Sequence, residues 1–344
     1  MPSHRLPFAV AGYYPKPLGK VPLLLDAIRI IVGLVALIYA ADRLVKSAVR
    51  ISRAFGVSVV LIGAVIVGFG TSVPEFVVSA IAALEGKLDL AVANVVSSNT
   101  ANLTLVLGSA ALIAPIIARR RIIKREGALM FAAVAVSAAF LANGWLSAWE
   151  GFVLLGLLVG AILLMIRWSN EDPDAVAAQV DDSDDIDLDA PKDRHAWRRE
   201  VGKEILIGIG ALVVTVIAAD LLLDGVVGIG ESFGLSSVFL GLITGVGTSL
   251  PELAAGISAA RHREPELVLG NILGSNVFNS LGVIGLAAVL GPGALTEITL
   301  APIAIMVSAA AIAGIFSFTG QRIDRTEGAV LLAGFVAYAI LAFV

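Results

Sequence analysis

Ten apolar runs, each about long enough to cross a lipid bilayer as an α-helix, fill most of this 344-residue chain. Only helices and closed barrels satisfy their backbone hydrogen bonds inside a membrane. Charged residues make up 15% of the chain, well below the roughly 25% that is typical of soluble domains. We therefore predict an all-α integral membrane protein. The predicted spans lie near residues 22–45, 57–84, 88–117, 126–143, 148–168, 203–224, 235–260, 266–291, 299–319 and 326–343.

The basic residues divide unevenly between the two sides of the membrane that ten spans define. Of the 24 Lys and Arg residues, 19 fall on one side. Because basic residues accumulate in cytoplasmic loops, this distribution predicts that both termini are extracellular and that the loop at 169–202 is cytoplasmic. The first span follows a polar, Pro-rich segment and lacks a small-residue cleavage site, so we expect a membrane helix there rather than a signal peptide. The predicted location is the plasma (inner) membrane, which the chain crosses many times.

The longest polar stretch lies between the fifth and sixth spans. Residues 171–193 carry ten Asp and Glu residues, without the glycine and closing glutamate that an EF-hand loop requires. We predict a solvated linker, and the alternative is a regulatory cation sensor. The predicted organisation is an extracellular segment (1–20), a first five-helix repeat (21–168), an acidic cytoplasmic linker (169–202) and a second five-helix repeat (203–344).

The two halves of the chain carry the same motif 177 residues apart. The sequence GTSVPE, which ends at Glu75, recurs as GTSLPE, which ends at Glu252. Each half contains five predicted spans, an odd number, so the second copy must cross the membrane upside down relative to the first. We therefore predict ten transmembrane helices arranged as two inverted five-helix repeats, an arrangement that places a binding site near the membrane midplane. The polar residues Asn94, Ser98, Asn99 and Asn102 recur at the same offset as Asn271, Ser275, Asn276 and Asn279.

The repeated residues are suited to binding a hard cation. Pro74 and Pro251 lack an N–H, so each leaves a helical carbonyl without its partner. A charged carboxylate within a membrane span costs at least about 2.5–3.5 kcal/mol and indicates a functional site. Prolines and small residues alone could serve helix packing, but packing does not explain two equivalent carboxylates. Carboxylate, hydroxyl and amide oxygens without Cys, Met or His are typical of Ca²⁺ or Na⁺ sites and unsuited to soft metals.

GTSVPE with NVVSSNTAN, and GTSLPE with GNILGSNVFN, resemble the two alpha-repeats of the sodium/calcium exchanger branch of the calcium/cation antiporter superfamily, in its prokaryotic form. The resemblance covers the chain apart from residues 1–20 and the acidic segment. It implies that the second, third, seventh and eighth helices form the ion core, and that the first and sixth slide across it to give alternating access. The Ca²⁺ ligands it implies are Thr71, Glu75, Thr248 and Glu252. The Na⁺ ligands it adds are Gly68, Ser98, Asn102, Gly245, Ser275 and Asn279.

The chain departs from the family pattern at a few positions. Ala93 and Ser97 replace glycines that are common in the family, and both replacements are small. Many relatives carry an Asp at one of the positions of Asn102 and Asn279, whereas both are neutral here, which disfavours the potassium-coupled branch. We predict a sodium/calcium antiporter with Na⁺ and Ca²⁺ as its transported substrates. The alternative is a proton/calcium antiporter, which would carry further titratable groups near the site.

Several other classes of protein have little support. The chain has no cysteine, no nucleophile with a histidine partner and no nucleotide-binding fingerprint, so we expect neither an enzyme nor a cofactor. A membrane scaffold would have no use for paired buried carboxylates. The three histidines lie far apart in polar or terminal stretches and are expected to be solvated. The net charge of −4 gives no indication of a nucleic-acid partner. We expect the protein to work as a monomer in the lipid bilayer.

Overall fold

The computed structural model describes residues 23–171, 194–233, 246–296, 298 and 300–341. The described chain is mostly helical, as its composition predicted. Within it, six helices are long and apolar enough to cross a membrane, or seven when the bent pair Val59–Thr71 and Val73–Leu84 is taken as one span. The count of ten spans therefore stays a prediction. The predicted extracellular segment and nearly all of the acidic run lie outside the described residues.

The helices follow the predicted order in both halves. Some are interrupted by π-helical segments, labelled η. The first half contains α1 (Leu23–Phe55), α2 (Val59–Ile62), η1 (Gly63–Gly68), α3 (Phe69–Thr71), α4 (Val73–Leu84), α5 (Leu88–Ala101), η2 (Asn102–Val106), α6 (Leu107–Ile113), α7 (Arg120–Ile122), η3 (Ile123–Gly127), α8 (Ala128–Leu141) and α9 (Ala148–Asn170). The second half contains α11 (Arg194–Ser232), α13 (Leu250–Arg261), α14 (Pro265–Val277), η4 (Phe278–Val283), α15 (Ile284–Leu290), α16 (Leu300–Gly320) and α17 (Arg325–Leu341).

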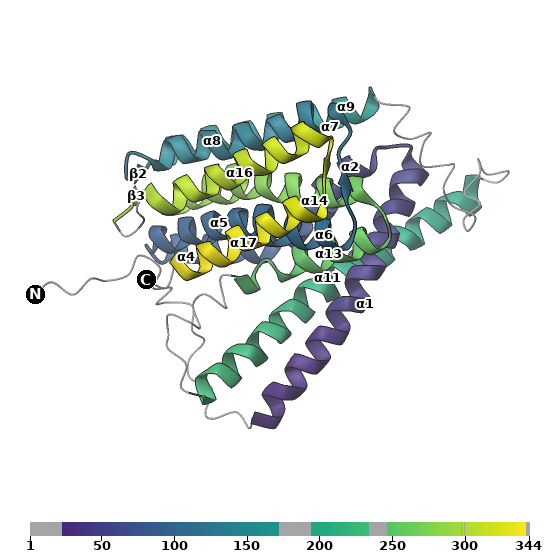
Figure 1. Cartoon of the computed structure of the whole chain (residues 1–344), viewed down its shortest axis with the longest axis horizontal. Coiled ribbons are helices and arrows are strands. Elements are labelled where there is room, and N and C mark those ends of the chain that lie inside the picture. The colour runs from purple at the N-terminus through teal and green to yellow at the C-terminus, as the bar shows by residue number, and fades with distance from the viewer. Residues whose placement is uncertain (1–22, 172–193, 234–245, 297, 299, 342–344) are drawn as a thin grey trace, which may run out of the picture.

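Helices α1 and α11 are longer than the spans predicted for them. The prediction ended the first span at residue 45 and began the sixth at 203, whereas α1 continues to Phe55 and α11 begins at Arg194. Hydropathy identifies only the part of a helix that can lie in lipid. The polar ends of α1 and α11 keep their helical hydrogen bonds beyond that part, so the helices are longer than their apolar runs. The two helices pack side by side and cross the other helices obliquely (Figure 1). A Cβ added to Gly33 would lie 2.7 Å from the backbone nitrogen of Leu222, so this contact is close.

The centre of the molecule is formed by the two spans that carry the polar stripes. In the span Leu88–Ile113, 78% of the residues in its apolar 18-residue stretch are buried, and in Pro265–Leu290 the same share is 83%. The same share is only 22% in α1 and 22% in α9, whose apolar side chains are therefore available to lipid. The predicted polar stripes thus lie on the two most enclosed spans.

Two short antiparallel ribbons join the halves. Strand β1 (Ile116–Ile117) pairs with β4 (Arg322–Ile323), and β2 (Trp145–Leu146) pairs with β3 (Gly293–Ala294). The offset of 177 residues relates β1 to β3 and β2 to β4, so the two ribbons are equivalent. Figure 1 places β2 and β3 at one end of the helices and α7, which follows β1, at the other end. Equivalent segments at opposite ends are what an inverted repeat requires.

Candidate ion-binding site

The two motif glutamates lie at equivalent breaks in the helices. Glu75 is in the first turn of α4 and Glu252 in the first turn of α13. The breaks fall at Ser72, with φ −83° and ψ 10°, and at Ser249, with φ −89° and ψ 8°. Both carboxyl groups are completely buried. The positive end of each helix dipole stabilises a negative charge in its first turn, which lowers the cost of burying these side chains.

Each glutamate is held by a serine from the other half of the chain. The Ser72 hydroxyl donates to Glu252 Oε1 at 2.8 Å, and the Ser249 hydroxyl donates to Glu75 Oε1 at 3.4 Å. The structure therefore brings the two carboxylates into one site between the halves. These two serines were not among the predicted ligands. Their signal was present, because both copies of the motif place a serine three residues before the glutamate.

Several buried polar atoms of the motif have no hydrogen-bond partner among the described residues. They include Oε2 of Glu75 and of Glu252, and both side-chain polar atoms of Asn102 and of Asn279. An unpaired buried polar group costs roughly 1–3 kcal/mol, and more when it is charged. A cation would satisfy the carboxylate and amide oxygens. The donor set thus fits a hard cation bound between the two halves.

The predicted ligands of the first half converge with residues of α14. The Thr71 hydroxyl donates to the carbonyl of Val67 at 2.9 Å and also lies 3.3 Å from the carbonyl oxygen of Gly68. The Ser275 hydroxyl donates to the same Gly68 carbonyl at 2.9 Å. The predicted ligand Gly68 therefore presents its carbonyl among the other predicted ligands. Its counterpart Gly245 lies outside the described residues.

The equivalent group in the second half is described in part. Thr248 is 9% exposed, and its hydroxyl lies 3.5 Å from that of Ser98, which is completely buried. Asn102 begins the π-helical segment η2, and Asn279 lies in η4. A π-helical turn alters the backbone pairing and often occurs at functional sites. The two amides thus lie where each span departs from regular α-helix.

The helix breaks are supported by two further amides of the motif. Asn94 Nδ2 donates to the backbone carbonyl of Glu75 at 3.2 Å, and Asn271 Nδ2 donates to that of Glu252 at 3.3 Å. These contacts fix the first turns of α4 and α13 against the neighbouring spans. The other repeated amides point elsewhere, since Asn99 donates to the Ser280 hydroxyl and Asn276 to the carbonyl of Ile272.

Among the described residues, two acidic side chains lie in the site, Glu75 and Glu252. Across the part of the chain that the structure describes, three or more His, Cys, Asp or Glu side chains nowhere gather into a metal-binding cluster. A cation in this site would therefore have two carboxylates as its charged ligands. The remaining donors are neutral oxygens. His262 is partly exposed and contacts Asp42 of α1, outside the site. Two carboxylates carry a formal charge of −2, which one divalent cation or more than one monovalent cation can balance.

A stripe of glycines lets α14 approach the first half closely. A Cβ added to Gly274 would lie 2.3 Å from the backbone oxygen of Ala64, and one added to Gly68 would lie 2.8 Å from that of Asn271. Such distances leave no space for a methyl group. The small residues therefore bring the Gly68 carbonyl within reach of Ser275.

We expect Gly274→Ala to destabilise the protein by about 1–3 kcal/mol, the usual cost of overpacking a tight contact. Thermal unfolding of the purified protein in detergent measures this change. The control is Gly156→Ala in α9, where an added Cβ would have nothing within 4 Å. Equal midpoints of thermal unfolding for wild type and Gly274→Ala would show that this contact is not tight.

Comparison with known proteins gives consistent matches over nearly the whole chain. The family described as sodium/calcium exchanger protein matches residues 26–167 and 203–344. The putative antiporter CaxA of Alkalimonas amylolytica is 37% identical over 328 residues, which cover 93% of this chain and 99% of that protein. The inner membrane protein YrbG of Escherichia coli is 31% identical over 93% of this chain and 98% of its own length. Sodium/calcium exchanger MaX1 of Methanosarcina acetivorans is 29% identical over 91% of this chain and 97% of its own length.

A solved structure shares the same fold. The sodium-calcium exchanger NCX_Mj, soaked with 10 mM Na⁺ and zero Ca²⁺, matches with a TM-score of 0.79 and 26% identity, covering 92% of this chain and 99% of that chain. The matched family and the relatives that are named as exchangers are transporters and not enzymes, which confirms the prediction that this chain is not an enzyme. The resemblance seen in the two motifs is likewise confirmed.

Proposed function

The chain belongs to the sodium/calcium exchanger protein family, and from this premise we propose that it exchanges Na⁺ for Ca²⁺ across the plasma (inner) membrane by alternating access. Membership of the family makes it a multi-pass membrane antiporter of cations. One observation carries the proposal: Glu75 and Glu252 are buried together, and one oxygen of each has no hydrogen-bond partner among the described residues. Inside a membrane such a pair is stable only when bound cations or protons neutralise it, and the two unpaired oxygens are where a cation would bind.

In the proposed Ca²⁺-bound state, the ligands are the two carboxylates and the hydroxyls of Thr71 and Thr248. Calcium takes six to eight oxygen ligands in flexible geometry, so backbone carbonyls such as that of Gly68 complete the shell. The formal charge of the two glutamates cancels that of the ion. Ser72 and Ser249 act as positioning residues, because each fixes one carboxylate oxygen and leaves the other for the ion.

In the proposed Na⁺-bound state, several monovalent ions replace the divalent one. They are held by the same carboxylates together with neutral oxygens. Na⁺ accepts such oxygens readily, and their number around the glutamates exceeds what one Ca²⁺ ion needs. The additional ligands that we propose are Gly68, Ser98, Asn102, Gly245, Ser275 and Asn279. Because the two kinds of ion share the carboxylates, they compete for the site, and this competition is the basis of exchange.

We further propose the arrangement that supports alternating access. The chain forms ten transmembrane helices in two inverted repeats, with both termini extracellular and the segment 169–202 cytoplasmic. The ribbons β1–β4 and β2–β3 support this arrangement, because equivalent strands lie at opposite ends of the helices. The pair α1 and α11 moves across the helices that carry the site and opens it to one side at a time.

The direct test is ⁴⁵Ca²⁺ uptake into proteoliposomes that contain the purified protein. Vesicles loaded with Na⁺ and diluted into Na⁺-free buffer should accumulate ⁴⁵Ca²⁺, and vesicles loaded with choline should not. Adding Na⁺ to the outside should release the accumulated ion. Uptake that is the same with both internal cations would overturn the proposed exchange.

Deleting residues 174–190 should leave exchange largely intact, because the acidic segment is predicted to be a solvated tether. The measurement is the dependence of ⁴⁵Ca²⁺ uptake on Ca²⁺ concentration, compared between the deletion variant and wild type. If a well-folded deletion variant shifts this dependence by about tenfold, the segment is a regulatory cation sensor, the alternative to the linker interpretation.

A further inference from the structure

The end of the molecule that carries α7 and η3 is rich in basic residues. Residues 119–125 include five Lys and Arg, and the distribution of basic residues predicts that this end is cytoplasmic. The side chains of this segment fall into two groups, which point to different neighbours. One group is bound by the protein itself, and the other is not.

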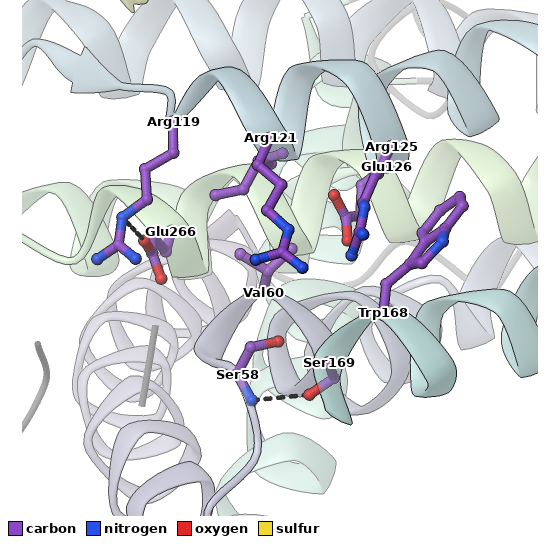
Figure 2. A pocket seen from close by; sticks show the side chains of 10 residues that line it. Ser58, Val60, Arg119, Arg121, Arg125, Glu126, Trp168, Ser169 and Glu266 are labelled. Carbon is purple, nitrogen blue, oxygen red and sulfur yellow. Dashed lines mark hydrogen bonds and ion pairs between the residues drawn. The ribbon is translucent and has the colours of Figure 1, made fainter. Parts of the chain in front are cut away.

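The bound group faces the cleft shown in Figure 2, where Arg119, Arg121 and Arg125 lie above Ser58, Glu266 and Trp168. Arg119 forms an ion pair with Glu266 at 2.8 Å. Arg125 pairs with Glu171 at 3.1 Å, and its guanidinium lies 5.7 Å from the centre of the Trp168 ring. Arg121 donates to the backbone carbonyl of Glu171 at 2.9 Å. These arginines hold the segment against α9 and α14.

The second group consists of Arg120 and Lys124, which are one helical turn apart, and Arg322 of β4. All three side chains are exposed. Within the described part of the chain, none of them makes a hydrogen bond or an ion pair through its side chain. Strand β4 pairs with β1, directly before α7, so Arg322 lies at the same end of the molecule. Three cations without a side-chain partner among the described residues therefore lie at this end of the molecule.

An apolar groove of about 700 Å³ begins at this edge. Lys124 and Thr319 line its basic end, and it continues between α8 and α16, which run side by side in Figure 1. Its floor includes Leu103 and Ile272, each adjacent in sequence to a site amide. The α16 residues that line it run from Ala310 to Thr319, roughly 13 Å at 1.5 Å per residue. That length approximates one leaflet of a hydrocarbon core about 30 Å thick.

We propose that this groove binds an anionic phospholipid, with an acyl chain between α8 and α16 and the headgroup phosphate beside Lys124, Arg120 and Arg322. The apolar lining suits a hydrocarbon chain, and the volume lies within the range of about 300–1,000 Å³ for small-molecule sites. Basic pockets between helices on the cytoplasmic side recognise anionic headgroups in the same way. The unpaired cations distinguish this groove from an ordinary lipid-facing surface.

The test measures which lipids stay bound to the purified full-length protein. The protein in neutral detergent is incubated with equal amounts of phosphatidylglycerol and phosphatidylcholine, and the retained lipid is identified by native mass spectrometry. Phosphatidylglycerol should be retained in preference. Lys124→Gln should reduce this preference about fivefold, the contribution of one basic residue near a membrane surface. Arg261→Gln, which removes an exposed cation from the end of α13, should leave the preference unchanged.

A second pair of variants tests the chain-binding part of the groove. Gly314 lines the groove, and an added Cβ there has nothing within 4 Å, so the larger side chain of Gly314→Leu starts in open space and occupies part of the groove. This variant should retain less of both lipids. Its control is Gly334→Leu in α17, where an added Cβ also has nothing within 4 Å; retention there should match wild type.

Three results would each overturn the proposal. The first is equal retention of the two lipids by wild type, or a preference that Lys124→Gln does not change. The second is unaltered retention by Gly314→Leu. The third is displacement of phosphatidylglycerol by an equal concentration of glycerol 3-phosphate, because the site would then recognise a free phosphate and not a lipid.

Discussion

Replacing either Glu75 or Glu252 with glutamine should reduce Ca²⁺ exchange by at least about 100-fold, because losing one buried charged contact to a bound partner costs about 2–5 kcal/mol and tenfold corresponds to about 1.4 kcal/mol. Glutamine has nearly the same shape and can still accept the hydrogen bond from the opposite serine, so the fold should survive. The remaining single negative charge cannot balance a divalent ion. The rate of ⁴⁵Ca²⁺ exchange in proteoliposomes at neutral pH measures the effect.

The matched control for both variants is Glu85→Gln. Glu85 follows α4 at its C-terminal end, where its exposed side chain pairs with Lys87. The same chemical change there should leave exchange at the wild-type rate. Size-exclusion chromatography in detergent shows whether each variant is folded. Near wild-type flux in a folded Glu75→Gln or Glu252→Gln protein would remove the proposed role of the pair.

An outward Na⁺ gradient should drive ⁴⁵Ca²⁺ uptake at neutral pH, whereas a pH gradient without Na⁺ should drive little. The physical reason lies in Asn102 and Asn279, whose amide oxygens can coordinate Na⁺ but cannot take up a proton in this pH range. The proposed ligands contain only two titratable groups, Glu75 and Glu252, and both are needed by Ca²⁺. Protons can compete with Ca²⁺ for these carboxylates at low pH, but competition alone does not couple two fluxes.

The two driving forces are compared in the same batch of vesicles. In one arm the interior contains Na⁺ at the external pH, and in the other it contains choline at a more acidic pH. Asn279→Ala, which removes a neutral oxygen and no charge, should weaken Na⁺-driven uptake. If the pH gradient alone drives uptake as well as the Na⁺ gradient does, the protein is a proton/calcium antiporter and the argument from the amides fails.

Much of the backbone can be predicted from the sequence, because both copies of the repeat contain residues that mark where helices begin or break. Pro74 and Pro251 were predicted to disturb helical hydrogen bonding, and in the structure α4 and α13 begin at the residue before each proline, after Ser72 and Ser249. The offset of 177 residues also relates Leu88, the first residue of α5, to Pro265, the first of α14. Apolar periodicity and proline act locally, so their effects can be inferred without knowing the tertiary structure.

Other features depend on contacts between distant parts of the chain and could not be inferred locally. The serine–glutamate bonds join residues 180 and 174 positions apart, and nothing in the spacing indicates which hydroxyl faces which carboxylate. Arg263 and Gln321 have φ values of 57° and 51°, where the equivalent positions in the other half are the glycines Gly86 and Gly144. A left-handed conformation without glycine costs roughly 1–2 kcal/mol, so sequence alone would not predict it.

The two ribbons join the halves of the chain by main-chain hydrogen bonds, and α1 and α11 take no part in them. Each ribbon fastens a strand of one half to a strand of the other, and both lie among the helices other than α1 and α11. Across the described residues, no backbone hydrogen bond joins α1 or α11 to any other helix. Displacing this pair would therefore break side-chain packing and the contact between Asp42 and His262, but no main-chain bond. The barrier to such a displacement therefore depends on the packing of side chains between the pair α1 and α11 and the other helices. Substitutions at this contact should change the rate of transport more than the affinity for the ion.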